Sequence, residues 1–284
     1  MMAVKIVTDS TSDLTPETAN ELGITIVPLN VHFDTEIGTE TYRDGVDLKA
    51  EDFYRRLEQS KTLPTTSAPA PGIFAEIYDK LAKDTDEILA ITISSKLSAT
   101  YKAAVDGKEL MKGKARLEII DSLSAMVGLG LIVISAAKVA KAGASFEEVI
   151  DVARSSMGRV DFRLAFDTLE YLRKGGRIGT AQAFLGSALK VNPILTIKNG
   201  LTEGVTRVRS RARAVDYLCE FVMGFPDIEE LAIEDATTPD EAEILAERLS
   251  SRFSRERIHW MNVGPVIGTH VGPHVLGVGV LSAK

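Results

Sequence analysis

Hydroxyl side chains gather directly after three short apolar runs of the sequence, and their types suit hydrogen bonding to an anionic group. The three loops read Asp9-Ser10-Thr11-Ser12-Asp13, Ser94-Ser95-Lys96-Leu97-Ser98 and Asp121-Ser122. In open parallel sheets the ligand site lies beyond the carboxyl ends of the strands, so these loops are expected to share one edge. A helix N-cap explains any one of these hydroxyls equally well, but three such loops together indicate a binding site.

A fourth hydroxyl cluster, Thr65-Thr66-Ser67, precedes a helix predicted to begin near Pro71. Hydroxyls and the free N–H groups of a helix start suit a carboxylate or a phosphate. The sequence has no GxxxxGK followed by Ser or Thr, no GxGxxG after a strand, no GxSxG and no HExxH. It therefore carries no nucleotide fingerprint and no hydrolase nucleophile of a known kind.

His270 and His274 lie in a glycine-rich segment, residues 264–280. Their spacing would suit a metal on a helix, but Gly272 and Pro273 interrupt one, so no metal is predicted. We interpret the segment as a glycine-rich loop that lets the backbone approach a ligand. His270 is then a hydrogen-bond donor to an anion, and the alternative is a structural histidine.

The composition predicts a two-domain cytoplasmic protein. The chain has 284 residues, 26% of them charged, and its single cysteine, Cys219, excludes an intramolecular disulfide. The start MMAVKIVTDS reaches Asp9 before any apolar stretch long enough for an export signal. The longest uncharged apolar run, residues 122–137, is too short to span a bilayer and predicts a helix buried in protein.

The net charge of −7 hides a strongly basic segment. Residues 154–213 carry 12 Lys and Arg against 4 Asp and Glu, a charge of +8, so the rest of the chain carries −15. Two clusters dominate it, at residues 173–177 and 207–213. A solvated helix face is the simpler explanation, but the clusters favour a patch aimed at an acidic partner. The acidic balance of the whole chain argues against nucleic-acid binding, although the second cluster leaves that alternative open.

Apolar runs at residues 4–8, 87–93 and 116–121 alternate with helical segments. This pattern predicts a Rossmann-like N-terminal α/β domain, residues 1–157, with a parallel sheet covered on both faces. Residues 24–33 and the polar stretch after them interrupt the pattern as a hairpin-like excursion. A second α/β domain with a mixed sheet, residues 158–284, is predicted from further strands and from the hairpin signal Asn199-Gly200.

Five segments resemble, in order and spacing, the signature segments of the bacterial DegV family. They are VTDSTSDL at 7–14, LPTTSAPAPG at 63–72, ISSKLSATY at 93–101, LEYLRKGGRIG at 169–179 and GPVIGTHVGP at 264–273. The resemblance spans almost the whole chain. Two departures stand at Ala68, where the family commonly has Gln, and at Ala99, where it commonly has Gly.

The resemblance implies a protein that binds a long-chain fatty acid in a tunnel between its domains. Characterised members are the non-catalytic subunit of a fatty acid kinase and present the acyl carboxylate to a separate subunit. That kinase subunit uses ATP and Mg²⁺ to form acyl phosphate for phospholipid synthesis, so no cofactor is expected on this chain. The alternative is a stand-alone lipid carrier or regulatory protein, and transient membrane contact fits either.

The resemblance also implies roles for individual residues. The carboxylate is expected at Thr65, Thr66 and Ser67, at Ser94 or Ser95, and at His270. Docking to the kinase subunit is expected at Arg177, Arg207 and Arg209.

Overall fold

Short apolar strands that end in polar residues form the parallel sheet of the N-terminal domain. In the computed structural model, which describes residues 4–185 and 191–283, the strand order is β2-β1-β6-β7 and every pairing is parallel. The bounds are β1 Lys5–Asp9, β2 Ile24–Val27, β6 Glu87–Thr92 and β7 Arg116–Asp121. The three hydroxyl-rich loops follow β1, β6 and β7, so they share one edge of the sheet as predicted.

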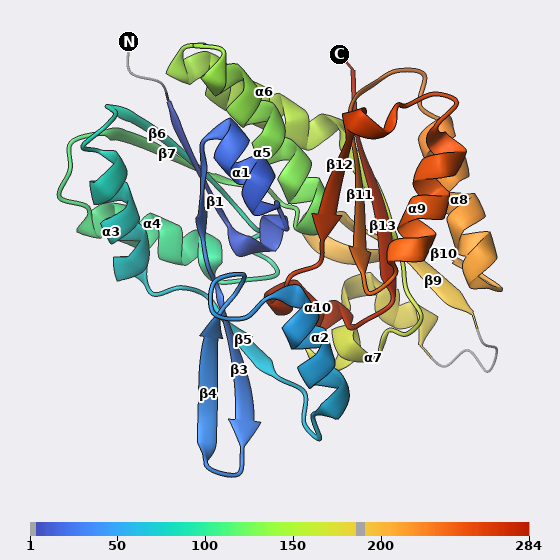
Figure 1. The fold of residues 1–284 in the computed structure, drawn as a ribbon. Helices are drawn as coiled ribbons and strands as arrows, with labels where there is room; N and C mark the ends of the chain where they lie inside the picture. The colour runs from blue at the N-terminus through green and yellow to red at the C-terminus, as the bar shows by residue number, and fades with distance from the viewer. Residues whose placement is uncertain (1–3, 186–190, 284) are drawn as a thin grey trace.

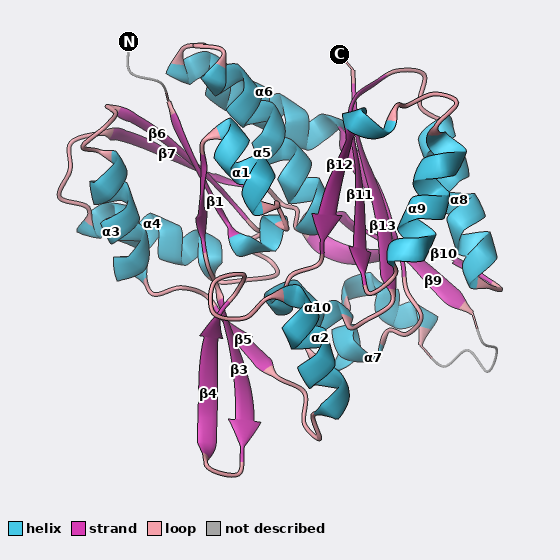
Figure 2. Cartoon of the chain, in the orientation of Figure 1, coloured by secondary structure: helices cyan, strands magenta, loops and turns pink. Residues whose placement is uncertain are grey.

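Helices cover both faces of this sheet (Figure 2). On one face lie α1 Pro16–Leu22 and α5 Met126–Lys141, and on the other lie α3 Pro71–Leu81 and α4 Thr100–Leu110. The sequence sets the start of α1, because the Thr15 side chain accepts a hydrogen bond from the Thr18 N–H and Pro16 occupies the first turn.

A small antiparallel sheet leaves the N-terminal domain between β2 and β6. The excursion predicted from residue 24 begins only at residue 30, because residues 24–27 form β2 of the parallel sheet. Its order is β4-β3-β5, with bounds β3 Asn30–Thr35, β4 Gly38–Arg43 and β5 Thr65–Ser67. The β3–β4 hairpin projects from the body at the bottom of Figure 1. The hydroxyl cluster Thr65–Ser67 is thus an edge strand paired with β3, and α2 Ala50–Gln59 lies between β4 and β5 in the chain.

The C-terminal domain has a six-stranded mixed sheet, which confirms the predicted fold class. Its order is β10-β9-β8-β13-β11-β12, with only β11 and β12 parallel. The bounds are β8 Val160–Ala165, β9 Asn192–Lys198, β10 Leu201–Val208, β11 Ile228–Ala236, β12 Ile258–Asn262 and β13 Val275–Ser282. Asn199 and Gly200 both have positive φ, 51° and 81°, and form the β9–β10 turn as predicted.

The glycine-rich segment is not a loop, which corrects the sequence analysis. Residues 265–271 form helix α10 Pro265–Val271, and β13 runs through the middle of the mixed sheet between β8 and β11. A Cβ on Gly279 would lie 2.7 Å from a Val127 methyl group, and one on Gly277 would lie 2.6 Å from Leu164. These glycines therefore serve close packing inside the sheet rather than loop conformation.

Helix α5 joins the two domains through one continuous core. It is buried along most of its length and packs on β1 and β6 of one sheet and on β8, β11 and β13 of the other. The boundary predicted after residue 157 falls inside α6 Phe146–Arg159. The remaining elements are α7 Glu170–Lys174, α8 Arg211–Met223, α9 Pro239–Leu249 and the 3-10 turns η1 Ser10–Ser12, η2 Gly179–Phe184 and η3 Arg255–Arg257.

Candidate functional site

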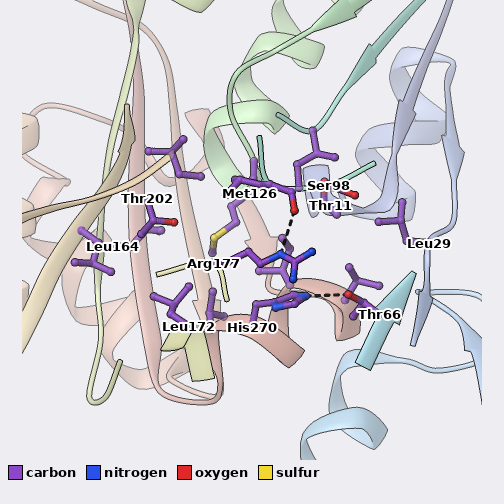
Figure 3. Close-up of a pocket in the computed structure, with 18 of the residues that line it drawn as sticks. Thr11, Leu29, Thr66, Ser98, Met126, Leu164, Leu172, Arg177, Thr202 and His270 are labelled. Carbon is purple, nitrogen blue, oxygen red and sulfur yellow. Dashed lines mark hydrogen bonds between the residues drawn. The ribbon is translucent and has the colours of Figure 1, made fainter. Parts of the chain in front are cut away.

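A cavity of about 280 Å³ lies between the two domains (Figure 3). Its walls are mostly apolar and come from both domains. The N-terminal domain contributes Ile93, Ala125 and Met126, and the C-terminal domain contributes Leu164, Leu172, Leu195 and Val271. Aliphatic walls from two domains suit a mostly apolar ligand held by burial rather than by many hydrogen bonds.

Thr66 and His270 line one end of the cavity and share a hydrogen bond, 2.8 Å from Oγ1 to Nε2. Pairing of β5 with β3 sets Thr66 opposite Val31, and helix α10 carries His270 to it from the other domain. The His270 Nδ1 is buried and has no hydrogen-bond partner among the described residues. The Thr66 hydroxyl and the His270 ring therefore form the polar end of the cavity, while the unpartnered Nδ1 packs against Gly175.

His270 is a neutral imidazole at neutral pH. Burial, and secondly the positive charge of Arg177, lower the pKa of His270 to about 4. Gly175 allows the ring to sit here, because a Cβ at that position would lie 2.4 Å from Nδ1. The neutral imidazole next to the Thr66 hydroxyl therefore adds no charge to this end of the cavity.

An outer hollow of about 530 Å³ adjoins this polar end. It shares Thr66, Arg177 and His270 with the cavity and adds Thr65 and Lys174. Thr65 is exposed in the edge strand β5. It lines the outer hollow but not the cavity itself. The polar end of the cavity therefore faces a second space toward the surface.

Besides Thr65, two more of the predicted carboxylate ligands, Ser94 and Ser95, do not line the cavity. The Ser94 hydroxyl donates to the Gly200 carbonyl at 2.8 Å, and this bond ties the loop after β6 to the C-terminal domain. Ser95 is exposed, and its backbone N–H donates to an Asp121 carboxylate oxygen. Ser67 does line the cavity, with its hydroxyl bonded to the ring of His32.

Other polar residues of the cavity were not singled out from the sequence. Thr11, Ser98, Thr196 and Thr202 all line it. Thr11 and Ser98 stand in the hydroxyl-rich loops after β1 and β6, which was the available signal. The Thr11 hydroxyl donates to Asp9, so it is already used within its own loop. Ala68 and Ala99, the two departures from the family pattern, also line the cavity.

The basic segment proves to be largely ion-paired. Among the described residues, only Arg177, Arg207 and Arg209 of this segment lack a carboxylate partner, and Lys190 lies outside the described residues. Arg207 and Arg209 are exposed, and the guanidinium of Arg207 stacks on the ring of Phe184 at 4.9 Å. The predicted docking residues are therefore the ones whose charge is uncompensated.

Arg177 differs from the other two because it lines the cavity. Its Nε donates to the Leu97 carbonyl at 3.1 Å, and its Nη1 donates to the Gly175 carbonyl at 2.7 Å. Leu97 belongs to the N-terminal domain and Gly175 follows α7, so the guanidinium bridges the two domains at the cavity (Figure 3).

A cluster of buried carboxyl groups lies elsewhere at the domain junction. Asp13 Oδ1 accepts from the Gly264 N–H at 2.9 Å, and Glu234 Oε2 accepts from the Val127 N–H at 3.1 Å. Asp13 Oδ2 and Glu234 Oε1 are buried and have no hydrogen-bond partner among the described residues. Burial, and secondly the negative charge of Glu234, raise the pKa of Asp13 well above its ordinary value, so we assign a proton to Asp13.

Asp44 stands beside this pair. It is 4% exposed, and burial, followed by the nearby charge of Asp13, raises its pKa to about 8. No group of three or more His, Cys, Asp or Glu residues that could hold a metal ion occurs in residues 4–185 and 191–283. Within the same residues, no helix is both long and apolar enough to cross a membrane.

The fold and the cavity define the class, a two-domain α/β protein with an apolar ligand cavity between its domains. The family model described as "Uncharacterised protein, DegV family" matches residues 3–283, and the chain belongs to the DegV family. It is 37% identical over 285 residues to a DegV domain-containing protein of Clostridium perfringens, covering 98% of each chain.

Solved structures share the whole fold. A DegV family protein of Thermus thermophilus, described by its fatty acid binding, superposes with a TM-score of 0.89 at 31% identity and covers 99% of this chain and 100% of its own. A stearic acid-binding protein of Eubacterium ventriosum gives 0.88 at 26% identity, with 98% of each chain covered.

Proposed function

We propose that this protein binds a long-chain fatty acid in the interdomain cavity, with the carboxylate at the Thr66–His270 end. The observation that carries the proposal is an apolar cavity with a neutral hydrogen-bonding pair at one end. Burial of each methylene contributes about 0.8 kcal/mol, so the acyl chain supplies most of the affinity. The fatty-acid-binding relatives from Thermus and Eubacterium support the same ligand class.

We further propose that the protein is the non-catalytic subunit of a cytoplasmic fatty acid kinase. It presents the carboxylate to a separate subunit that uses ATP and Mg²⁺ to form acyl phosphate for phospholipid synthesis. Two observations support this step: the outer hollow reaches the polar end of the cavity, and Arg207 and Arg209 are exposed without carboxylate partners. A positive surface of this kind suits an acidic protein partner.

Stearate binding to Thr66→Val and His270→Ala tests the ligand site. We expect each variant to bind stearate about tenfold more weakly with an unchanged circular dichroism spectrum, because each removes one hydrogen bond to a charged group. Thr41→Val is the matched control, since Thr41 also hydrogen-bonds a histidine, His32, at 2.8 Å but lies on the projecting hairpin. Unchanged affinity in both cavity variants would overturn the assignment.

The kinase step is separated from lipid binding by Arg209→Glu. With the kinase subunit, ATP and Mg²⁺ present, we expect slower acyl phosphate formation and unaltered stearate affinity, because Arg209 lies outside the cavity. Stearate binding without any ATP-dependent acyl phosphate would favour the stand-alone carrier instead.

A further inference from the structure

Helix α5 begins without a cap from its own stretch of sequence. Its N-cap residue, Ala125, has a methyl side chain, and none of residues 126–129 is acidic. The cap comes instead from the other domain, because the Val127 N–H donates to Glu234 Oε2 at 3.1 Å. Glu234 is fully buried on strand β11. Its carboxyl oxygen thus satisfies one of the N–H groups that a helix start leaves free.

The start of α5 is also a strained point of the backbone. Met126 has a φ of 57°, in the left-handed region that residues with a side chain seldom occupy. Such a conformation costs free energy and persists only where the surrounding structure holds it. The Met126 side chain is buried and lines the interdomain cavity (Figure 3). The strained residue is therefore part of the cavity wall.

Close packing brings this first turn against the C-terminal sheet. A Cβ on Gly128 would overlap the Phe162 ring of β8, and one on Gly279 of β13 would lie 2.7 Å from a Val127 methyl group. Strand β11 is the next neighbour of β13 in the sheet. The two glycines therefore let α5 come near enough for Glu234 to reach its first turn.

A second carboxyl group of β11 holds the other end of α5. Glu230 forms an ion pair with Lys138, which stands in the last turn of the helix, and bonds the ring of His259 at 2.8 Å. Neither Glu230 nor Lys138 is among the described residues that line the cavity. Of the two attachments of α5 to β11, only the one at Glu234 adjoins the cavity wall.

We propose that Glu234 is a positioning residue for the cavity, which holds Met126 in the left-handed conformation that places its side chain in the wall. The Val127 N–H belongs to the peptide group directly after Met126, so the bond to Glu234 fixes the backbone of Met126. Glu234 is not among the described residues that line the cavity, and it acts only through α5. This inference rests on the proposed function, because the affinity for an acyl chain reports the state of the wall.

The test compares stearate binding to Glu234→Asp and Glu234→Gln. Aspartate keeps the carboxyl group but is one methylene too short to reach the Val127 N–H, whereas glutamine keeps the reach and an acceptor oxygen without the charge. We expect stearate to bind about fivefold more weakly to Glu234→Asp and within about twofold of the wild type to Glu234→Gln. Glu230→Asp is the matched control, because it makes the same change on the same strand at the far end of α5. Its stearate affinity is expected to stay within about twofold of the wild type.

A second readout follows the Met126 side chain itself. In ligand-free protein labelled in its methionine methyl groups, the NMR signal of Met126, assigned with Met126→Leu, is expected to shift in Glu234→Asp. It is expected to stay near its wild-type position in Glu234→Gln and in Glu230→Asp.

An unchanged Met126 signal or an unchanged stearate affinity in Glu234→Asp would overturn the inference. An equal loss of affinity in Glu230→Asp would overturn it too, because it would show a general effect of loosening α5. A wild type that binds no stearate would instead overturn the proposed function, and the methyl signal would still test whether Glu234 positions Met126.

Discussion

Two polar regions at the domain junction use their hydrogen bonds in opposite ways. At the cavity, the Nη2 group of Arg177 has no partner among the described residues. In the carboxyl cluster, Asp13 and Glu234 each accept a hydrogen bond from a backbone N–H of the other domain, and one oxygen of each stays buried without a partner among the described residues. The cavity therefore keeps a cationic donor available, whereas the hydrogen bonds of the cluster join the two domains.

The difference also concerns charge. The described residues that line the cavity include a cation, Arg177, and no anion. The cluster has three carboxyl groups, and no positively charged residue is among the causes of their pKa shifts. The charge of Arg177 therefore favours an anionic ligand in the cavity, whereas burial favours the protonated form of the carboxyl groups in the cluster. We expect substitutions in the first region to change binding and substitutions of Asp13 and Asp44 in the second to change stability.

Removing Asp13 is the largest expected effect. Asp13→Ala leaves the Gly264 N–H without its acceptor at the domain junction, which is expected to cost about 2 kcal/mol of unfolding free energy. Asp13→Asn, which keeps a donor and an acceptor, is expected to cost less. Urea denaturation measures both variants. A loss below about 1 kcal/mol in Asp13→Ala would mean that the cluster does not hold the domains together.

Raising the pH is expected to destabilise the protein by a smaller amount. The pKa of Asp44 is raised to about 8 by folding, so its stabilising proton is lost as the pH rises through 8. From pH 7 to pH 9 this one group is expected to lower the unfolding free energy by about 1.4 kcal/mol. His270 does not disturb this window, because its pKa of about 4 keeps it neutral throughout.

The matched variant for the pH effect is Asp44→Asn, which cannot titrate. Its unfolding free energy, measured in urea at several pH values, is expected to fall less between pH 7 and pH 9 than that of the wild type. An identical slope in both proteins would show that Asp44 is not the titrating group.

The smallest expected effect is at the back of the His270 ring. Gly175→Ala places a methyl group 2.4 Å from Nδ1, so the ring must shift, and stearate affinity is expected to fall about fivefold. Gly158→Ala is the control, because nothing lies within 4 Å of a Cβ there. Equal stearate affinities in the two variants would show that the position of the ring is not critical for binding.

Much of the fold was predictable because local patterns agree with the tertiary structure. The strands that end at Asp9 and Asp121, and the turn at Asn199-Gly200, could be predicted from residues that are adjacent in the sequence. The strand β13 was missed because Gly277 and Gly279 lower strand propensity locally. Glycine is required at these two positions because the strand packs closely against Leu164 and Val127, which are far away in the sequence.

The candidate site was less predictable from residues alone. Thr66 and His270 are 204 positions apart, and only the family resemblance joined them. Ser94 carried the same signal as Ser98, and only the three-dimensional contact with Gly200 separates their roles. The carboxyl cluster left little signal, because β11 contains four acidic residues and the sequence does not show that Glu234 is the one that lies near Asp13.

Native mass spectrometry of the purified protein, followed by solvent extraction and identification of the lipid, tests the central claim most directly. We predict one long-chain fatty acid per chain, displaced by added stearate and retained less well by His270→Ala. A wild-type protein that emerges without lipid and takes up no stearate would contradict the account.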